Sequence, residues 1–293
     1  MPWPSDPVAA VTHPDPWDYY ADLATRPMHF HEGLGSWVAA APDDVVAVLT
    51  HPDARVRPGA EPVPPHLAGT TAGEVFAGMA RFTEGPAHAA RRQAIVERLD
   101  SFTPDQVSDA CRAAAATMGD APAEEWMAAF PAAVLAHLFD LPLPVGEVVT
   151  AARALAACFG ATGTAAEVEA AETAIQALPP EVVPFLFQAF DATAGLIGHV
   201  VADHDVPAVH NTRRFFDVDA TAAGCDLAAG DRVLVVLVTA RLPFGTGPHQ
   251  CPAGPFATTI AEFAAAHIGP RAEPTGYRDL PNVRVPEWSP EPP

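Results

Sequence analysis

The chain has 293 residues, 49% of them apolar, and a formal net charge of −20. All 16 basic residues are arginines, and this acidic balance argues against a nucleic-acid partner, because phosphate binding needs a basic stripe. No apolar run approaches the ~18–20 residues that span a bilayer, and the start of the chain has no pattern of a secretory signal. We therefore expect a cytoplasmic protein without a membrane segment, built as one large domain or two.

The N-terminal third predicts short mixed structure. A helix is expected over Asp15–Ala24, and two short strands, Met28–Phe30 and Ser36–Ala40, flank a hairpin turn. A second helix over Pro42–Leu49 has acidic residues near its start and valines on its apolar face. Residues 58–69 are rich in proline and glycine, which predicts a loop.

The next segment, EGPAHAARRQAIVERL, predicts a helix that carries a paired histidine and arginine. His88 and Arg92 are four residues apart and therefore share one helix face. From the residues alone, the plain interpretation is a solvated arginine-rich helix face.

The middle of the chain is predominantly helical by pattern. Residues 102–141 predict helix, with a break at Pro131. Two modest helices follow, over Val145–Phe159 and Ala165–Leu178, separated by the turn GATGT. Glu181–Val201 then predicts a long apolar helix that contains Asp191 and Thr193. For Asp191 the plain alternative is a local hydrogen bond to the helix backbone.

The last third predicts strands and a tail. The run after Arg214, DVDATAAGCDLAAGDRVLVVLVTA, indicates a strand, a turn at residues 229–231 and a second strand. The proline-rich tail over 270–293 predicts a short strand or hairpin and then a frayed end.

One cysteine lies in a distinctive loop near the C-terminus, LPFGTGPHQCPAG, over Leu242–Gly254. Cys251 is presented where this irregular loop enters a predicted helix over Pro255–Ile268. Free N–H groups at a helix start favour a thiolate, and a thiolate suits a soft metal centre. The alternative is a buried structural cysteine. The four cysteines of the chain are scattered with no Cys-x-x-Cys pair, so neither a zinc site nor a disulfide framework is indicated.

The spacing of Phe244, Gly247, His249 and Cys251 resembles the haem-ligand loop of the cytochrome P450 family. The resemblance extends over most of the chain, from Asp15 to about Ile268. It implies a mainly α (α+β) fold, a P450-like helical domain with a small β portion, as a single domain over residues 1–293. It also implies a haem b cofactor with its iron bound by the cysteine.

The resemblance assigns further roles by position. Cys251 would be the metal ligand, and His88, Arg92, Arg214 and His249 would hold the haem propionates, since buried carboxylates need cationic partners. Phe244 and Gly247 would complete the cofactor-binding loop. On the Glu181–Val201 helix, Asp191 takes the position of the family acid and Thr193 that of a second threonine. Both would be catalytic residues of the distal pocket.

The chain departs from the family pattern at several places. Ala253 stands where the family usually has a glycine two residues after the cysteine. Ala192 replaces the threonine that normally helps deliver protons. No Glu-x-x-Arg occurs anywhere in the sequence, and the meander segment before the cysteine loop is missing. Removing part of an ion-pair network would cost roughly 3–5 kcal/mol, whereas removing all of it avoids that cost. An internally truncated but folded member is therefore favoured over an engineered or miscalled deletion.

Three functions follow from these observations. The first is a haem-thiolate oxidoreductase of the monooxygenase or peroxygenase type, acting on a small organic molecule in bacterial secondary metabolism, with a ferredoxin or peroxide as oxidant source. The acidic surface disfavours steering of an acidic ferredoxin. The second is a haem-dependent isomerase, dehydratase or cyclase. The third is a non-catalytic P450-like binding or scaffold protein.

Overall fold

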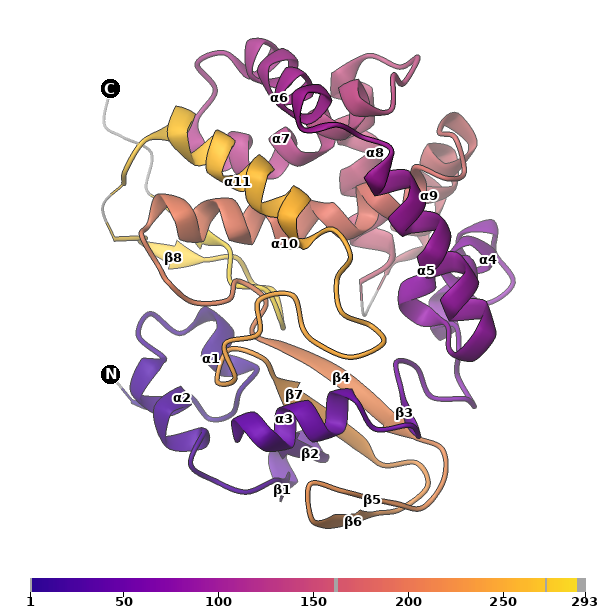
Figure 1. The fold of residues 1–293 in the computed structure, drawn as a ribbon, viewed down its shortest axis with the longest axis vertical. Helices are drawn as coiled ribbons and strands as arrows, with labels where there is room; N and C mark the ends of the chain where they lie inside the picture. Colours follow the sequence, from indigo (N-terminus) through magenta and orange to yellow (C-terminus); the bar gives the residue numbers. More distant parts are fainter. Residues whose placement is uncertain (1, 161–162, 272, 289–293) are drawn as a thin grey trace. The chain divides into compact units, whose positions relative to one another are not determined.

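The computed structural model describes residues 2–160, 163–271 and 273–288, which form two compact units (Figure 1). The first unit comprises Met1–Pro62, His204–Cys251 and Ala272–Pro293, and the second comprises Val63–Asp203 and Pro252–Arg271. The single domain expected over residues 1–293 stays a prediction. Over the described ranges, none of the helices combines the length and the apolar character that crossing a membrane requires.

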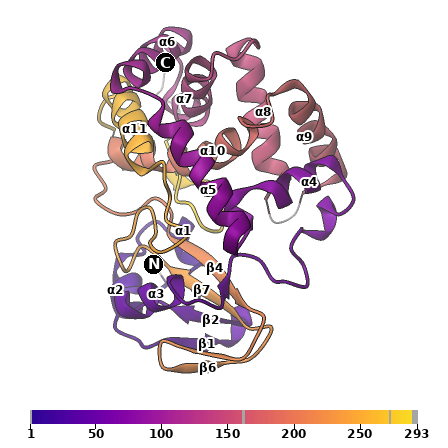
Figure 2. The ribbon, with the colours of Figure 1, turned by 45° about the vertical axis from the view of Figure 1, so that its right-hand side comes forward.

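A five-stranded sheet organises the first unit, with the strand order β1-β2-β7-β4-β3. Strands β2 and β7 run parallel, and the other neighbours are antiparallel (Figure 2). The bounds are β1 His29–His31, β2 Ser36–Ala39, β3 Ala54–Arg55, β4 Asn211–Phe216 and β7 Arg232–Val236. The predicted hairpin β1–β2 is confirmed, and a 3₁₀ turn over Glu32–Leu34 forms its loop.

Apolar clusters cover both sides of β7. Successive side chains of a strand point to opposite faces of the sheet. Val233 and Val235 pack into one apolar cluster with α3, which spans Pro42–Leu49 as predicted. Val236 packs into another cluster with Tyr20 of α2 (Trp17–Leu23) and with Ala10 of α1 (Ala9–Thr12). The continuous apolar run of β7 is typical of a strand that is covered on both faces.

The remaining strands form two small hairpins. One pairs β5 (Ala220–Ala222) with β6 (Cys225–Leu227), and the other pairs β8 (Gly276–Tyr277) with β9 (Pro286–Glu287). The predicted turn at residues 229–231 leads from β6 into β7. Arg214 lies inside β4, opposite Val233, rather than before a strand as the sequence suggested. The hairpin expected in the tail is present, while residues 272 and 289–293 lie outside the described ranges.

Arg284 ties the C-terminal segment to the N-terminal one. Its side chain is 0% exposed, and its guanidinium donates hydrogen bonds to the carbonyl oxygens of Val11, His13 and Pro14 at 2.7–3.1 Å. The guanidinium also lies 3.3 Å from the ring centroid of Tyr277. Burial lowers its pKa. Neutral carbonyls and an aromatic face thus stabilise a charge that would be costly alone.

Eight helices form the described second unit around α10. Helix α10 packs against α7, α8 and α11. The helices are α4 Thr71–Gly78, α5 Gly85–Asp100, α6 Pro104–Met118, α7 Ala123–Leu138, α8 Val145–Cys158, α9 Ala165–Ala177, α10 Val183–Val201 and α11 Gly254–Ile268, and short 3₁₀ segments cover Pro65–Leu67 and Ala80–Phe82. The predictions for α8 and α9 are confirmed to within one residue. Residues 161–162 of the predicted GATGT turn lie outside the described residues.

The predicted helix break at Pro131 is wrong. Helix α7 continues through Pro131, and the break falls earlier, between α6 and α7. Gly119 ends α6 with a φ of 52°, and Pro122 is the N-cap of α7. A proline inside a helix removes one backbone hydrogen bond, but α7 is buried along most of its length and tertiary packing outweighs that loss.

The two short connections that mark the truncation are confirmed. Helix α10 ends at Val201 and β4 begins at Asn211, and the described residues 202–210 between them contain no helix. Strand β7 ends at Val236 and α11 begins at Gly254, and only turns and loop lie between these two elements over the described residues.

Candidate haem-thiolate site

Backbone hydrogen bonds define the cysteine loop between β7 and α11. The N–H of Cys251 donates to the carbonyl of Phe244 at 2.9 Å, and the N–H of Gln250 donates to Gly247 at 3.1 Å. Gly247 has a φ of 75°, and a Cβ there would lie 2.9 Å from the carbonyl oxygen of Leu49 at the end of α3. Glycine is therefore required where the loop approaches α3. The loop is anchored to the sheet unit at that point.

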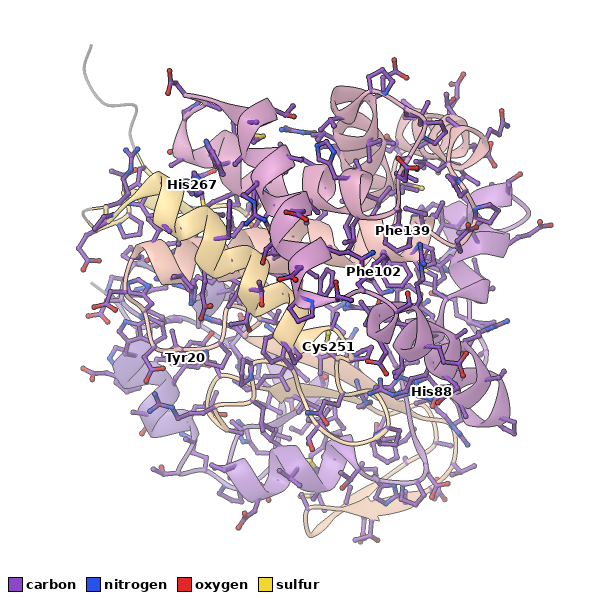
Figure 3. All side chains as sticks on the ribbon, turned by 45° about the horizontal axis from the view of Figure 1, so that its top comes forward. Tyr20, His88, Phe102, Phe139, Cys251 and His267 are labelled. Carbon is purple, nitrogen blue, oxygen red and sulfur yellow. The ribbon has the colours of Figure 1, made fainter. Side chains whose placement is uncertain are left out.

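The thiol of Cys251 is exposed, which excludes the buried structural cysteine considered from sequence. Cys251 lies just before α11 (Figure 3). The N-cap of this helix is Ala253, two residues further on. The side chain of Ala253 makes no capping hydrogen bond to this helix, and the first N–H groups of a helix favour a nearby negative charge. The loop therefore presents Cys251 at the surface, two residues before the N-cap of a helix.

The other three cysteines differ from Cys251. Cys111 and Cys158 are buried, and burial raises the pKa of each to about 11. Burial also raises the pKa of Cys225, whose thiol donates to the carbonyl of Met28 at 3.3 Å. These three side chains remain neutral thiols at physiological pH, so Cys251 is the best candidate for a metal ligand.

Two predicted propionate ligands lie with Cys251 in the first unit. Arg214 of β4 is 6% exposed, and one of its guanidinium nitrogens donates to the carbonyl of Arg213 at 2.8 Å. His249 is partly buried in the cysteine loop itself. A nearly buried arginine beside the sheet suits a carboxylate partner, because such a charge is stabilised by an opposite one.

The other two predicted propionate ligands lie in the second unit. His88 and Arg92 are on α5 one turn apart, and His88 is 7% exposed (Figure 3). Burial of His88 on this polar helix excludes a fully solvated face at that position. The helix thus offers a histidine and an arginine on one side, as the sequence predicted.

Asp191 and Thr193 both lie on α10, but they face different sides of it. Positions two apart on a helix project about 200° from one another. Thr193 is 4% exposed and belongs to the buried side of α10, whereas Asp191 and Ala192 are partly exposed. A molecule bound on one side of α10 can therefore contact Asp191 or Thr193, but not both. Their catalytic roles stay predictions.

The donor set of the chain suits a haem-thiolate centre better than a multidentate metal site. Within the described residues, no group of three or more His, Cys, Asp or Glu side chains could hold a metal ion. A single exposed thiol at an uncapped helix start, in a loop closed by its own backbone, is the kind of donor that an axial thiolate needs. The residues present therefore fit the predicted cofactor.

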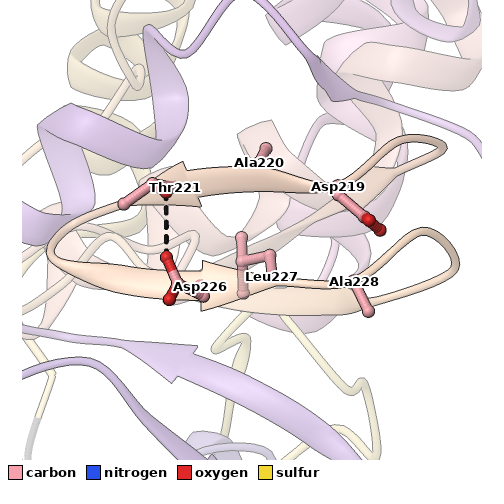
Figure 4. A pocket seen from close by; sticks show the side chains of 6 residues that line it. All are labelled: Asp219, Ala220, Thr221, Asp226, Leu227 and Ala228. Carbon is pink, nitrogen blue, oxygen red and sulfur yellow. Dashed lines mark hydrogen bonds between the residues drawn. The ribbon is translucent and has the colours of Figure 1, made fainter.

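Two surface depressions in the first unit were not indicated by any sequence pattern. One has a volume of about 420 Å³ and lies on the β5–β6 hairpin (Figure 4). The other has a volume of about 390 Å³ and lies at the N-terminal segment. Neither is lined by Cys251. Folding brings their lining residues together without any spaced motif that a single sequence could reveal.

Known proteins resemble this chain in structure and not in sequence. No protein-family model and no curated protein matches it. The cytochrome P450 RauA, solved with a biosynthetic intermediate of aurachin RE, is 17% identical with a TM-score of 0.75, and the match covers 97% of this chain and 96% of that one. Epothilone D-bound cytochrome P450epoK is 16% identical with a TM-score of 0.76, covering 93% and 94%.

A third solved structure, substrate-free CYP109E1 from Bacillus megaterium, is 17% identical with a TM-score of 0.64 and covers 87% of this chain and 90% of that one. These likenesses agree with the order of elements, from the β1–β2 hairpin to the cysteine loop before α11. The chain therefore has the cytochrome P450 fold, in a shortened form of 293 residues.

Proposed function

We propose that the protein is a haem-thiolate oxidoreductase of the monooxygenase or peroxygenase type that acts on a small organic molecule. The observation that carries the proposal is the exposed Cys251 thiol, held by its own backbone hydrogen bond to Phe244 at the uncapped start of α11. A haem bound there would supply activation of dioxygen or peroxide, aided by electron donation from the thiolate.

The chain's own residues would bind and orient the cofactor. Cys251 would provide the sulfur ligand, and the rigid turn at Gly247 would fix the position of that ligand. His88, Arg92, Arg214 and His249 would neutralise the propionates. Loss of any of these side chains would weaken haem affinity.

Proton delivery would rest on α10. The carboxylate of Asp191 could hold a proton at its Oδ atoms, or the Oγ1 hydroxyl of Thr193 could donate one, and the helix geometry allows only one of them to face a given side. Ala192 offers no hydroxyl at the position where the family has one. A peroxide-driven cycle therefore has as much support as reduction by a ferredoxin.

The substrate class and the setting of the reaction are inferred from the neighbours. RauA was solved with a biosynthetic intermediate and P450epoK with epothilone D. A small, largely apolar molecule of bacterial secondary metabolism, met in the cytoplasm, is the corresponding proposal for this chain.

The direct test is the absorption spectrum of the reduced, carbon monoxide-bound protein, compared with Cys251→Ser. We expect a thiolate-ligated band in the parent protein and its loss in the variant, while circular dichroism shows that the variant remains folded. A parent protein that binds no haem would instead support the non-catalytic binding or scaffold function, which the missing Glu-x-x-Arg motivates.

A second candidate function is a haem-dependent isomerase, dehydratase or cyclase, favoured by the missing hydroxyl at Ala192. Turnover separates the two candidates. Product formed with peroxide, or with a ferredoxin system and dioxygen, supports the oxidoreductase. Product formed under strict anaerobiosis without a reductant supports the second candidate.

A further inference from the structure

The depression at the N-terminal segment, here called the Trp3 pocket, is lined by aromatic rings, prolines, a histidine and carboxylates. It has a volume of about 390 Å³, within the range of small-molecule sites. All of its walls belong to the first unit, and it is lined by Trp3, Pro4, His13, Pro14, Asp15, Asp18 and Tyr19. Aromatic rings and carboxylates together make up most of this lining.

Two aromatic rings form one side of the Trp3 pocket. Trp3 and Tyr19 meet edge to face, with ring centroids 6.0 Å apart and planes at 84°. The Trp3 side chain is 57% exposed, so much of its indole surface is left open to a ligand. Tyr19 contacts Tyr20, whose hydroxyl is 2.8 Å from Nδ1 of buried His210. The aromatic wall is therefore supported from behind.

Two carboxylates form the other side. Within the described part of the chain, the side chains of Asp15 and Asp18 make no hydrogen bond or salt bridge. Asp15 acts at longer range on the buried Arg284. Asp18 also lies in the first turn of α2, where a carboxylate stabilises the helix. That contribution leaves its outward oxygens available to a ligand.

His13 connects two segments that line the pocket. Its Nδ1 accepts the N–H of Asp15 at 3.1 Å, and its Nε2 lies 3.0 Å from the carbonyl oxygen of Pro2. The ring thus joins the segment that carries Trp3 to the segment that carries Asp15.

The depression on the β5–β6 hairpin provides a contrast (Figure 4). There Asp226 accepts the hydroxyl of Thr221 at 2.9 Å, and Asp219 accepts the N–H of Ala229 at 2.9 Å. Both carboxylates are used by the hairpin itself, and no aromatic ring lines that depression. Of the two depressions, only the Trp3 pocket combines aromatic rings with carboxylates that make no hydrogen bond or salt bridge to the residues that the structure describes.

We propose that the Trp3 pocket binds a small organic ammonium ion. The rings of Trp3 and Tyr19 attract a cation through their faces, and alkyl groups on the nitrogen fill the apolar part of the pocket. The carboxylates of Asp15 and Asp18 supply the opposite charge. A bare metal ion would be held less well, because it would leave the aromatic wall unused.

The test titrates the full chain with choline and, separately, with 3,3-dimethyl-1-butanol, its neutral analogue of the same shape. Calorimetry gives the affinities, and NMR follows the indole N–H signals. We expect choline to bind at least about fivefold more tightly than the alcohol, to shift the indole signal of Trp3 and to bind more weakly at high salt.

Matched variants identify the groups responsible. We expect Trp3→Ala and Asp18→Asn each to weaken choline binding about two- to fivefold, and Trp3→Phe to retain most of it. Asp43→Asn is the control, because Asp43 is also an acidic residue in the first turn of a helix, α3, but lies outside the pocket. This control should leave the affinity unchanged.

Three results would overturn the proposal: no detectable choline binding, equal binding of choline and the alcohol, or an unchanged affinity in Trp3→Ala. Thermal unfolding of each variant is measured alongside, so that a loss of folding is recognised. Asp18→Asn is expected to change stability only slightly, so a loss of choline binding by a folded variant supports the pocket.

Discussion

The cysteine loop and helix α10 have kept different parts of the P450 pattern. The loop retains Phe244, Gly247, His249 and Cys251, and its backbone is fixed by hydrogen bonds and by the close approach of Gly247 to Leu49. Helix α10 is equally well packed, but it carries Ala192 where the pattern has a hydroxyl. In the proposed assignment, the loop thus keeps the residues expected to hold the ligand, while α10 lacks one residue expected to deliver protons.

This difference separates two requirements of a haem-thiolate enzyme. Holding the sulfur in place depends on the backbone conformation of the loop, which requires glycine at Gly247. Supplying a proton depends on one side chain, which a substitution can remove without disturbing the fold. If the proposed function is right, a change on α10 can alter the reaction without altering the binding of the haem.

The largest expected effect is on the stability of the unit that carries the loop. Arg284→Met removes three hydrogen bonds from a charged donor and leaves the buried carbonyl of Val11 without one. We expect a loss of about 3–5 kcal/mol. Hydrogen exchange should show faster exchange in the strands of the first unit, with the helices of the second affected less.

Leu155→Ala is the complementary change in the second unit. Leu155 is fully buried on α8, and its truncation should cost about 2–5 kcal/mol. Here the helices should exchange faster than the strands. If each variant speeds exchange equally in all segments, the two units unfold as one cooperative structure. The comparison between the cysteine loop and α10 would then not reflect two separately stable units.

The next effect concerns the loop itself. Gly247→Ala forces a side chain into a left-handed backbone conformation and against the Leu49 carbonyl, and we expect a cost of about 2–3 kcal/mol with weaker haem binding. Gly245→Ala is the control, because Gly245 has a φ of 68° but nothing within 4 Å of the added Cβ. That variant should lose only about 1 kcal/mol. Equal costs would mean that the contact with α3 does not fix the loop.

A smaller effect is expected on α10. Ala192→Thr restores a hydroxyl, and we expect turnover with dioxygen and a ferredoxin system to rise about tenfold, while turnover with peroxide changes little. Ala192→Val has a similar shape without the hydroxyl and should show no gain. A gain in both variants would point to packing rather than to proton delivery.

The smallest effect is a difference in thiol reactivity. The raised pKa of about 11 keeps Cys111 and Cys158 protonated at pH 8, and both are buried, so they should resist alkylation. Exposed Cys251 should be alkylated first and should be protected once haem is added. Mass spectrometry of the alkylated peptides checks this order. Equal labelling with and without haem would contradict ligation by Cys251.

The sequence predicted local structure well where the signals were local. Helix α3 has its predicted bounds, and α9 begins at the capping box formed by Thr164 and Glu167. The position of Cys251 before α11 is likewise a local feature. The helix break predicted at Pro131 is wrong, because the burial of α7 outweighs the tendency of one proline to end a helix.

Contacts between distant segments could not be predicted. The guanidinium of Arg284 reaches carbonyls some 270 residues earlier, and Tyr20 meets His210 from 190 residues away. Similarly, Asp191 and Thr193 point to different sides of α10 because the helix is continuous over both positions. A single sequence holds no local pattern for the Arg284 and Tyr20 contacts.

X-ray absorption at the iron edge of the haem-loaded protein tests the central assignment most directly. We predict one sulfur atom in the coordination sphere of the iron, present in the parent protein and in Cys225→Ser, and lost in Cys251→Ser. An iron with only nitrogen and oxygen neighbours in the parent protein would contradict the assignment of Cys251 as the ligand.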